Sequence, residues 1–87
     1  MEAYQLELEP GWDRFMKKFD STIQERIWKK VWKLALEGKS RHLKHGLDYF
    51  VSEVGGYRIV FDEIDDRKVK KIYFVGTHKQ YENWIST

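Results

Sequence analysis

Apolar and polar residues alternate near the start of the chain, where Tyr4, Leu6 and Leu8 are separated by polar residues. A period of two predicts a short β-strand with one covered face. Pro10 and Gly11 follow, and this pair predicts the end of the strand.

The apolar spacing then becomes helical. A short helix is predicted whose inner face is formed by Trp12, Phe15, Met16 and Phe19, at i, i+3, i+4 and i+7. A longer helix is expected after it, because Ser21 and Gln24 match a capping box and Gly38 is a natural stop. The long helix would carry an apolar stripe of Ile23, Ile27, Val31 and Leu34, with Trp28, Trp32 and Ala35 beside it.

The second half of the chain is strand-rich. Gly55-Gly56 is a tight-turn signal and predicts a hairpin between two strands. The expected elements are a loop at 39–46, strands at 49–54, 57–61 and 69–75, a charged turn at 62–68 and a short helix at 79–85.

This order, β-α-α-β-β-β with a short C-terminal helix, predicts an α+β fold. Two N-terminal helices would pack on a mainly antiparallel sheet. No linker or repeat interrupts the chain, so residues 1–87 are expected to form a single domain.

The amino-acid composition excludes several kinds of site and classes of protein. The chain has no cysteine, which excludes disulfides and thiolate metal sites. No apolar run approaches the roughly 20 residues of a membrane span, and no signal-peptide pattern follows Met1, so we expect a soluble, cytoplasmic protein. The net charge is only +2, but residues 29–46 hold six Lys or Arg against one acid. Such a segment either attracts a polyanion or is a solvated helix face, and charge alone does not separate the two.

Three segments resemble one known family. They are RHLKHG at 41–46, GGYRIVFDEIDD at 55–66 and KKIYFVGTHKQY at 70–81. Together with the element order, they resemble the RelE/ParE toxin superfamily, and most closely the RelE- and HigB-like messenger-RNA interferases of type II toxin–antitoxin systems.

The resemblance implies a ribosome-dependent endoribonuclease. Such toxins cut messenger RNA in the ribosomal A site without a metal or other cofactor and are neutralised by a cognate antitoxin. The 2′-hydroxyl of the RNA attacks the adjacent phosphate, so the protein must move two protons and stabilise the charged phosphorane.

His78 is the central candidate. It follows the predicted strand directly after Gly76 and Thr77, and histidine changes its charge near neutral pH, which suits a general acid or base. Some members of the family place an arginine here, where it would bind phosphate. The alternative is a histidine that merely ends a strand.

Arg58 alternates in direction with Tyr57 and Ile59, so it would stand on the face that the two helices leave uncovered. Its guanidinium presents a fork of donors that matches phosphate oxygens. The resemblance implies an active-site arginine here. The alternative is a salt bridge to a nearby acid such as Asp62.

Tyr81 lies three residues beyond His78, so a helical turn would bring the two together. Its ring could stack a nucleobase, or its hydroxyl could share in proton transfer. The resemblance implies a functional aromatic residue near this position. The alternative is a core aromatic packed beside Trp84.

The basic loop supplies the remaining candidates. Members of the family use lysines or histidines here for phosphate binding or proton transfer, and Lys44 is our first choice for a catalytic role, with His45 second. Arg41, His42, His45 and Lys79 are expected to bind RNA or the ribosome.

Other interpretations remain open. The histidines could suggest zinc, but the cationic surroundings and the lack of carboxylates at ligand spacing oppose it. The rivals to the nuclease are a ParE-like gyrase inhibitor and a non-catalytic RNA- or protein-binding domain of the same fold. Trp28 and Trp32 are expected to belong to the core or to be covered by the antitoxin.

Overall fold

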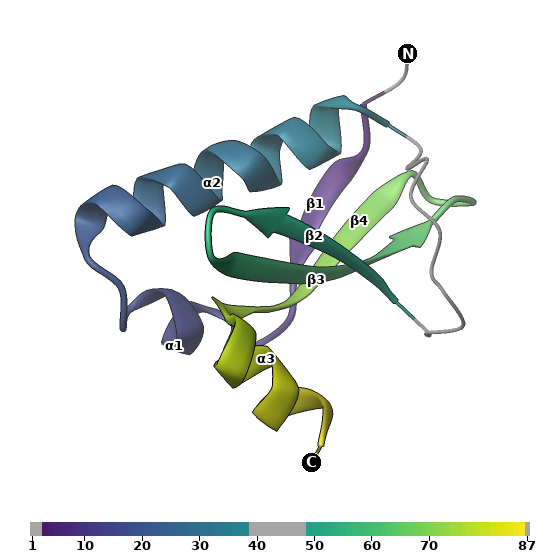
Figure 1. Cartoon of the computed structure of the whole chain (residues 1–87). Coiled ribbons are helices and arrows are strands. Elements are labelled where there is room, and N and C mark those ends of the chain that lie inside the picture. The colour runs from purple at the N-terminus through teal and green to yellow at the C-terminus, as the bar shows by residue number, and fades with distance from the viewer. Residues whose placement is uncertain (1–2, 39–48, 87) are drawn as a thin grey trace.

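The computed structural model describes residues 3–38 and 49–86 and forms three helices and a four-stranded sheet, as predicted (Figure 1). No helix in this part of the chain has the length and apolar character needed to cross a membrane. The elements are β1 (Gln5–Leu8), α1 (Asp13–Met16), α2 (Ser21–Leu36), β2 (Phe50–Val54), β3 (Tyr57–Ile64), β4 (Val69–Thr77) and α3 (His78–Ile85).

The sheet is mainly antiparallel, with strand order β1-β4-β3-β2. Only β1 runs parallel to its neighbour, β4. β2 and β3 form the expected hairpin, since Val54 pairs with Tyr57 across Gly55-Gly56. Gly55 has a φ of 58°, a conformation that glycine adopts without steric cost.

Helix α2 begins one residue earlier than its capping pattern suggested. The N-cap is Asp20, whose carboxylate accepts a hydrogen bond from the Ile23 amide, and Gln24 donates back to the Phe19 carbonyl. The Ser21–Gln24 capping box is therefore wrong, because aspartate accepts this bond as well as serine does. At the other end the helix stops as expected before Gly38, which has a φ of 73°.

Strands β3 and β4 are longer than predicted. Acidic residues 62 and 63 lie inside β3 rather than in a turn, because each faces a lysine on the neighbouring strand: Asp62 pairs with Lys71 and Glu63 with Lys70. Opposite charges directly across an antiparallel pair stabilise a sheet. The turn is restricted to 65–68, and β4 continues to Thr77.

Two apolar clusters cover the two faces of the sheet. A shift in register between Val60 and Phe61 bends β3, and both residues are fully buried, on opposite faces. Phe61 belongs to the cluster beneath α1 and α2, whereas Val60 packs with Phe74 and Tyr81 beneath α3. The predicted C-terminal helix, α3, thus covers the second face of the sheet, which the sequence had left without a cover.

Lys70 is completely buried on the face of the sheet that α2 covers. Its Nζ donates to the Leu34 carbonyl near the end of α2 and lies 3.4 Å from a carboxylate oxygen of Glu63, itself only 4% exposed. A buried charge survives only when it is paired and hydrogen-bonded. This lysine therefore links the end of α2 to β3 and β4.

Candidate functional site

Strand pairing brings Arg58 close to the start of α3. Arg58 on β3 is the register partner of Gly76 on β4, and Tyr57 is the partner of Thr77. His78 follows as the first residue of α3. The GYR and VGTH segments, separated by about twenty residues in sequence, therefore meet at one end of the sheet.

Two neighbours hold the Arg58 side chain. Its Nε lies 3.3 Å from a carboxylate oxygen of Glu53, the residue that pairs with it across the β2–β3 hairpin. Its guanidinium carbon lies 4.8 Å from the centroid of the Tyr81 ring. Arg58 lies, as predicted, on the face of the sheet that α1 and α2 leave uncovered. The cover by α3 at this end of the face was not predicted, and it leaves the side chain 22% exposed. The acid that pairs with Arg58 is Glu53, not Asp62 as we had considered.

Thr77 fixes the start of α3. Its hydroxyl accepts a hydrogen bond from the Gln80 amide, and the Gln80 side chain accepts one from the Thr77 amide, which makes a complete capping box. A side chain at position 76 would meet Phe74 Cζ at 2.6 Å and Gln80 Oε1 at 2.9 Å, so only glycine fits there. The VGTH segment thus sets the direction in which α3 leaves the sheet.

His78 projects into solvent from the first turn of α3. Its side chain is 60% exposed, and Nε2 lies 3.0 Å from a carboxylate oxygen of Glu82, one helical turn away. A carboxylate oxygen can only accept, so Nε2 carries the proton in this contact. In a neutral imidazole, Nδ1 is then left as a proton acceptor.

Tyr81 is buried, at 6% exposure, and the guanidinium of Arg58 lies over its ring. Its hydroxyl lies 3.4 Å from that of Tyr49, and its ring packs with Val60 and Phe74. Tyr81 is therefore a neighbour of Arg58 and Tyr49, whereas the contact made by His78 is with Glu82. Its burial beside Trp84 also agrees with a role in the core, the alternative raised from the sequence.

The remaining predicted residues divide into two groups. Lys79 is exposed on the first turn of α3. The four residues of the basic loop, Arg41, His42, Lys44 and His45, lie outside the described residues.

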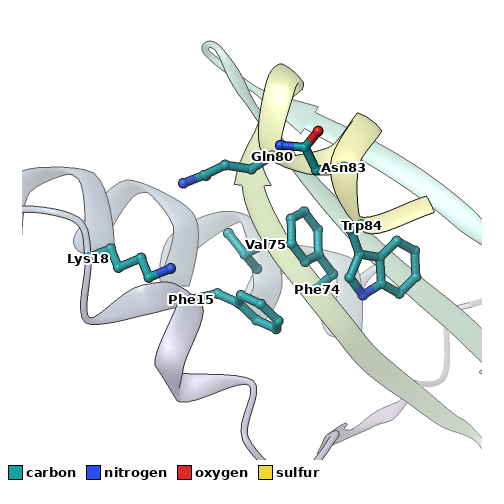
Figure 2. A pocket seen from close by; sticks show the side chains of 7 residues that line it. All are labelled: Phe15, Lys18, Phe74, Val75, Gln80, Asn83 and Trp84. Atoms are coloured by element: carbon teal, nitrogen blue, oxygen red, sulfur yellow. The ribbon is translucent and has the colours of Figure 1, made fainter. Parts of the chain in front are cut away.

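A pocket of about 320 Å³ lies between α1, β4 and α3. Its aromatic rings come from α1, β4 and α3. Figure 2 shows Lys18 and the polar ends of Gln80 and Asn83 around them. The residues that line it are Phe15, Lys18, Phe74, Val75, Gln80, Asn83 and Trp84.

Solved structures with the same architecture are toxins of known type. An arginine-to-alanine double mutant of Escherichia coli RelE in the free state superposes with a TM-score of 0.75 and 26% identity, over 97% of this chain and 93% of that one. RelE in the intact E. coli RelBE toxin–antitoxin complex gives a TM-score of 0.64 and 26% identity over 86% and 96% of the two chains. This chain has the RelE-like toxin fold.

More distant structures share the RelE fold as well. The archaeal RelE–RelB complex of Pyrococcus horikoshii matches with a TM-score of 0.63 at 15% identity, over 87% of this chain and 96% of that one. At that identity the likeness concerns the fold alone. No protein-family model and no curated protein sequence matches the chain.

Two partners in this candidate site could have been predicted from the sequence but were not. Glu53 follows from the hairpin register, because a two-residue turn at Gly55-Gly56 places it opposite Arg58. Glu82 is four residues after His78, the spacing at which helical side chains interact. Tyr49 gave no such signal, because it meets Tyr81 only through the tertiary fold.

Within residues 3–38 and 49–86, no group of three or more histidine, aspartate or glutamate side chains is arranged to hold a metal ion. The charged groups that surround Arg58 and His78 are single carboxylates, Glu53 and Glu82. The described part of the candidate site therefore offers a guanidinium, an imidazole and a phenol, with a carboxylate beside each of the first two.

Proposed function

We propose that this protein is the toxin of a type II toxin–antitoxin pair and that it cleaves messenger RNA in the ribosomal A site. The fold is that of RelE toxins. The observation that carries the proposal is that two contacts orient the side chain of Arg58. Its guanidinium is oriented by Glu53 and Tyr81 next to the strand end from which His78 projects. A preorganised cation at the strand end that precedes an exposed imidazole suits phosphoryl transfer.

The reaction needs no metal or cofactor. The 2′-oxygen of one nucleotide forms a bond to the adjacent phosphorus, and the bond from phosphorus to the 5′-oxygen of the next nucleotide breaks. One proton leaves the 2′-hydroxyl and one is delivered to the departing 5′-oxygen. The products are a 2′,3′-cyclic phosphate and a free 5′-hydroxyl, and translation stops because the message is cut.

Arg58 stabilises the phosphorane in this scheme. Glu53 contacts Nε and leaves the two terminal amino groups as donors for phosphate oxygens. Because the ring of Tyr81 lies against the guanidinium, the fork is held in one orientation before RNA arrives. Tyr81 acts here as a positioning residue.

His78 moves a proton. Its contact with Glu82 engages Nε2, so Nδ1 of the neutral ring can accept the 2′-hydroxyl proton. The position is exposed, which allows a bulky ribosome-bound message to reach it. Lys44 is proposed as a second catalytic group, and the RNA or ribosome contacts are assigned to Arg41, His42, His45 and Lys79.

A cognate antitoxin is the expected protein partner, because the E. coli and P. horikoshii RelE structures include complexes with RelB. The proposed site of action is the cytoplasm, where the ribosome and messenger RNA are found.

A non-catalytic binding domain is the second candidate, and one observation favours it. Arg58 already has a carboxylate partner and is only 22% exposed, as expected for a structural ion pair. A ParE-like gyrase inhibitor is the weaker alternative, because gyrase binding needs no general acid or base at the position of His78.

Primer extension on a defined message tests the proposal. The purified protein is added to programmed ribosomes and, separately, to the same message without ribosomes. We expect cuts inside the A-site codon only when ribosomes are present, with 5′-hydroxyl ends on the downstream fragments. A folded protein that cuts neither substrate would favour the binding-domain candidate, and a gyrase supercoiling assay on the same preparation would separate that candidate from a ParE-like inhibitor.

A further inference from the structure

The pocket between α1, β4 and α3 has the composition of a ligand site, and none of the residues that line it has a part in the proposed cleavage. Its volume of about 320 Å³ lies within the range of small-molecule pockets, which are mostly apolar with a few polar groups that orient the ligand. The rings of Phe15, Phe74 and Trp84 form its apolar wall. We call it the aromatic pocket.

The rings of the aromatic pocket are held in place by contacts within the protein. Phe74 is 3% exposed, meets Phe15 edge-on at 4.8 Å and stacks on Trp84 with the two centroids 5.2 Å apart. Trp84 is met edge-on by Tyr49 as well. Ordered rings lose little conformational freedom when a ligand covers them, and aromatic side chains stack nucleobases regardless of sequence.

The polar groups around these rings are suited to an anion and to the edge of a base (Figure 2). Gln80 Oε1 accepts a hydrogen bond from the Thr77 amide, so the NH₂ group is the end of this side chain that is left to donate. Asn83 offers a donor and an acceptor together, the combination that pairs with N7 and N6 of adenine. Lys18 is exposed and has no carboxylate partner in the described part of the chain, and none of the described residues that line the pocket is acidic.

We propose that the aromatic pocket binds an adenine nucleotide, with the base against the rings and the phosphate at Lys18. The rings supply the stacking surface, Asn83 reads the edge of the base, and the ammonium group of Lys18 makes a charge-assisted hydrogen bond to the phosphate. A free mononucleotide and a nucleotide within single-stranded RNA share this chemistry. The proposal goes beyond the proposed function and does not depend on it.

A second hollow, of about 560 Å³, adjoins the aromatic pocket and shares Phe15 and Trp84 with it. Arg14 lines this hollow and has no carboxylate partner within residues 3–38 and 49–86. The carboxylate in its wall, Glu9, is paired with Lys71 at 2.9 Å. The next nucleotide of an RNA chain could therefore continue into the second hollow, whereas a free mononucleotide would end at Lys18.

The test is isothermal titration calorimetry of the full chain with AMP. Three comparison ligands each lack one feature: adenosine has no phosphate, ribose 5-phosphate has no base, and N-acetyltryptophanamide represents an aromatic side chain of a protein. The variants are Lys18→Gln and Asn83→Ala, both at exposed positions. The controls are Lys17→Gln, a neighbouring exposed lysine that pairs with Asp13, and Trp32→Ala, which removes a ring that is 56% exposed on α2.

We expect AMP to bind the natural chain, Lys17→Gln and Trp32→Ala alike, and Lys18→Gln and Asn83→Ala about tenfold more weakly. Adenosine and ribose 5-phosphate should each bind at least about tenfold more weakly than AMP. The absence of AMP binding, or equal binding by all the variants, would overturn the proposal. So would AMP binding that is lost in Arg58→Lys, because the ligand would then occupy the site of Arg58, or tighter binding of N-acetyltryptophanamide than of AMP.

An adenylate trinucleotide distinguishes the two sources of the nucleotide. Tighter binding of the trinucleotide than of AMP, with the gain lost in Arg14→Gln, would support the proposal with RNA as the ligand. Binding no tighter than that of AMP would support it with a free nucleotide as the ligand. Trinucleotide binding that Lys18→Gln leaves unchanged would overturn it.

Discussion

The guanidinium of Arg58 lies over the ring of Tyr81, 4.8 Å from its centroid. One residue comes from the middle of the chain and the other from the last helix, and the contact closes α3 onto the second face of the sheet. A contact of this kind both orders the cation and buries the aromatic ring. It therefore gives a single geometric basis for the proposed phosphate site.

Replacing Arg58 by lysine should separate geometry from charge. Arg58→Lys retains one positive charge but loses the fork and the Nε contact with Glu53. We expect the rate of A-site cleavage to fall about 10²–10³-fold, the typical cost of losing a donor to transition-state charge. Single-turnover cleavage on programmed ribosomes measures it. Arg67→Lys is the control, because Arg67 is 64% exposed, pairs with Glu7 and lies in the turn after β3, at the opposite end of that strand from Arg58. An equal loss there would count against a specific role for Arg58.

Conservative changes at Tyr81 distinguish positioning from proton transfer. Tyr81→Phe keeps the ring beneath Arg58 and loses only the hydroxyl near Tyr49. Tyr81→Leu removes the cation–π contact, worth about 0.5–2 kcal/mol, and should slow cleavage by about 2- to 30-fold. We expect Phe to retain most of the activity. If Phe and Leu are equally impaired in the same assay, the hydroxyl takes part in the chemistry and the positioning role is wrong.

Gly76 should tolerate no side chain. In Gly76→Ala the new Cβ would lie 2.6 Å from Phe74 Cζ and 2.9 Å from Gln80 Oε1, so the capping box or the cluster beneath α3 must shift. Overpacking of this kind costs about 1–3 kcal/mol of unfolding free energy. Urea denaturation of Gly76→Ala beside Gly56→Ala provides the comparison, because a Cβ at position 56 meets nothing within 4 Å. Two variants of equal stability would contradict the tight packing at position 76.

Alkaline pH should remove the stabilisation that Lys71 provides. Its hydrogen bond with the Glu9 carboxylate, at 2.9 Å, raises the pKa of Lys71 above the ordinary value of 10.5. A raised pKa means that the folded state holds the proton more tightly, so the contribution is complete below pH 10.5 and disappears as the pH rises through the folded value. The difference in unfolding free energy between the natural chain and Lys71→Gln should be constant from about pH 7 to 10 and shrink above it. A difference in unfolding free energy that grows with pH would contradict this prediction. The control is Lys17→Gln, because Lys17 is an exposed lysine next to α1.

Local patterns in the sequence were sufficient to predict the order of the helices and strands and the β2–β3 hairpin. The helical spacing of Ile27, Val31 and Leu34 correctly predicted the buried face of α2, because burial of a stripe imposes that period. Arg58 and His78 were selected from a resemblance and from strand alternation, and the structure places their strand ends side by side.

What could not be predicted depends on contacts between distant segments. Lys70 has the composition of a surface residue, and only the tertiary fold supplies Glu63 and the Leu34 carbonyl that allow its burial. The length of β3 was underestimated because Asp62 and Glu63 read as turn residues until their lysine partners are known. The cover over Arg58 was missed because the packing direction of α3 depends on the Thr77 cap and on Gly76.

The central claim is that this RelE-like chain is a nuclease in which His78 moves a proton. The most direct measurement is single-turnover cleavage of a defined message on programmed ribosomes by the natural chain and by His78→Ala, both shown to be folded by circular dichroism. We predict cuts within the A-site codon and a fall of about 10²–10⁴-fold in rate for His78→Ala. Equal rates for the two proteins would contradict the role of His78, and the absence of cutting by either would contradict the nuclease itself.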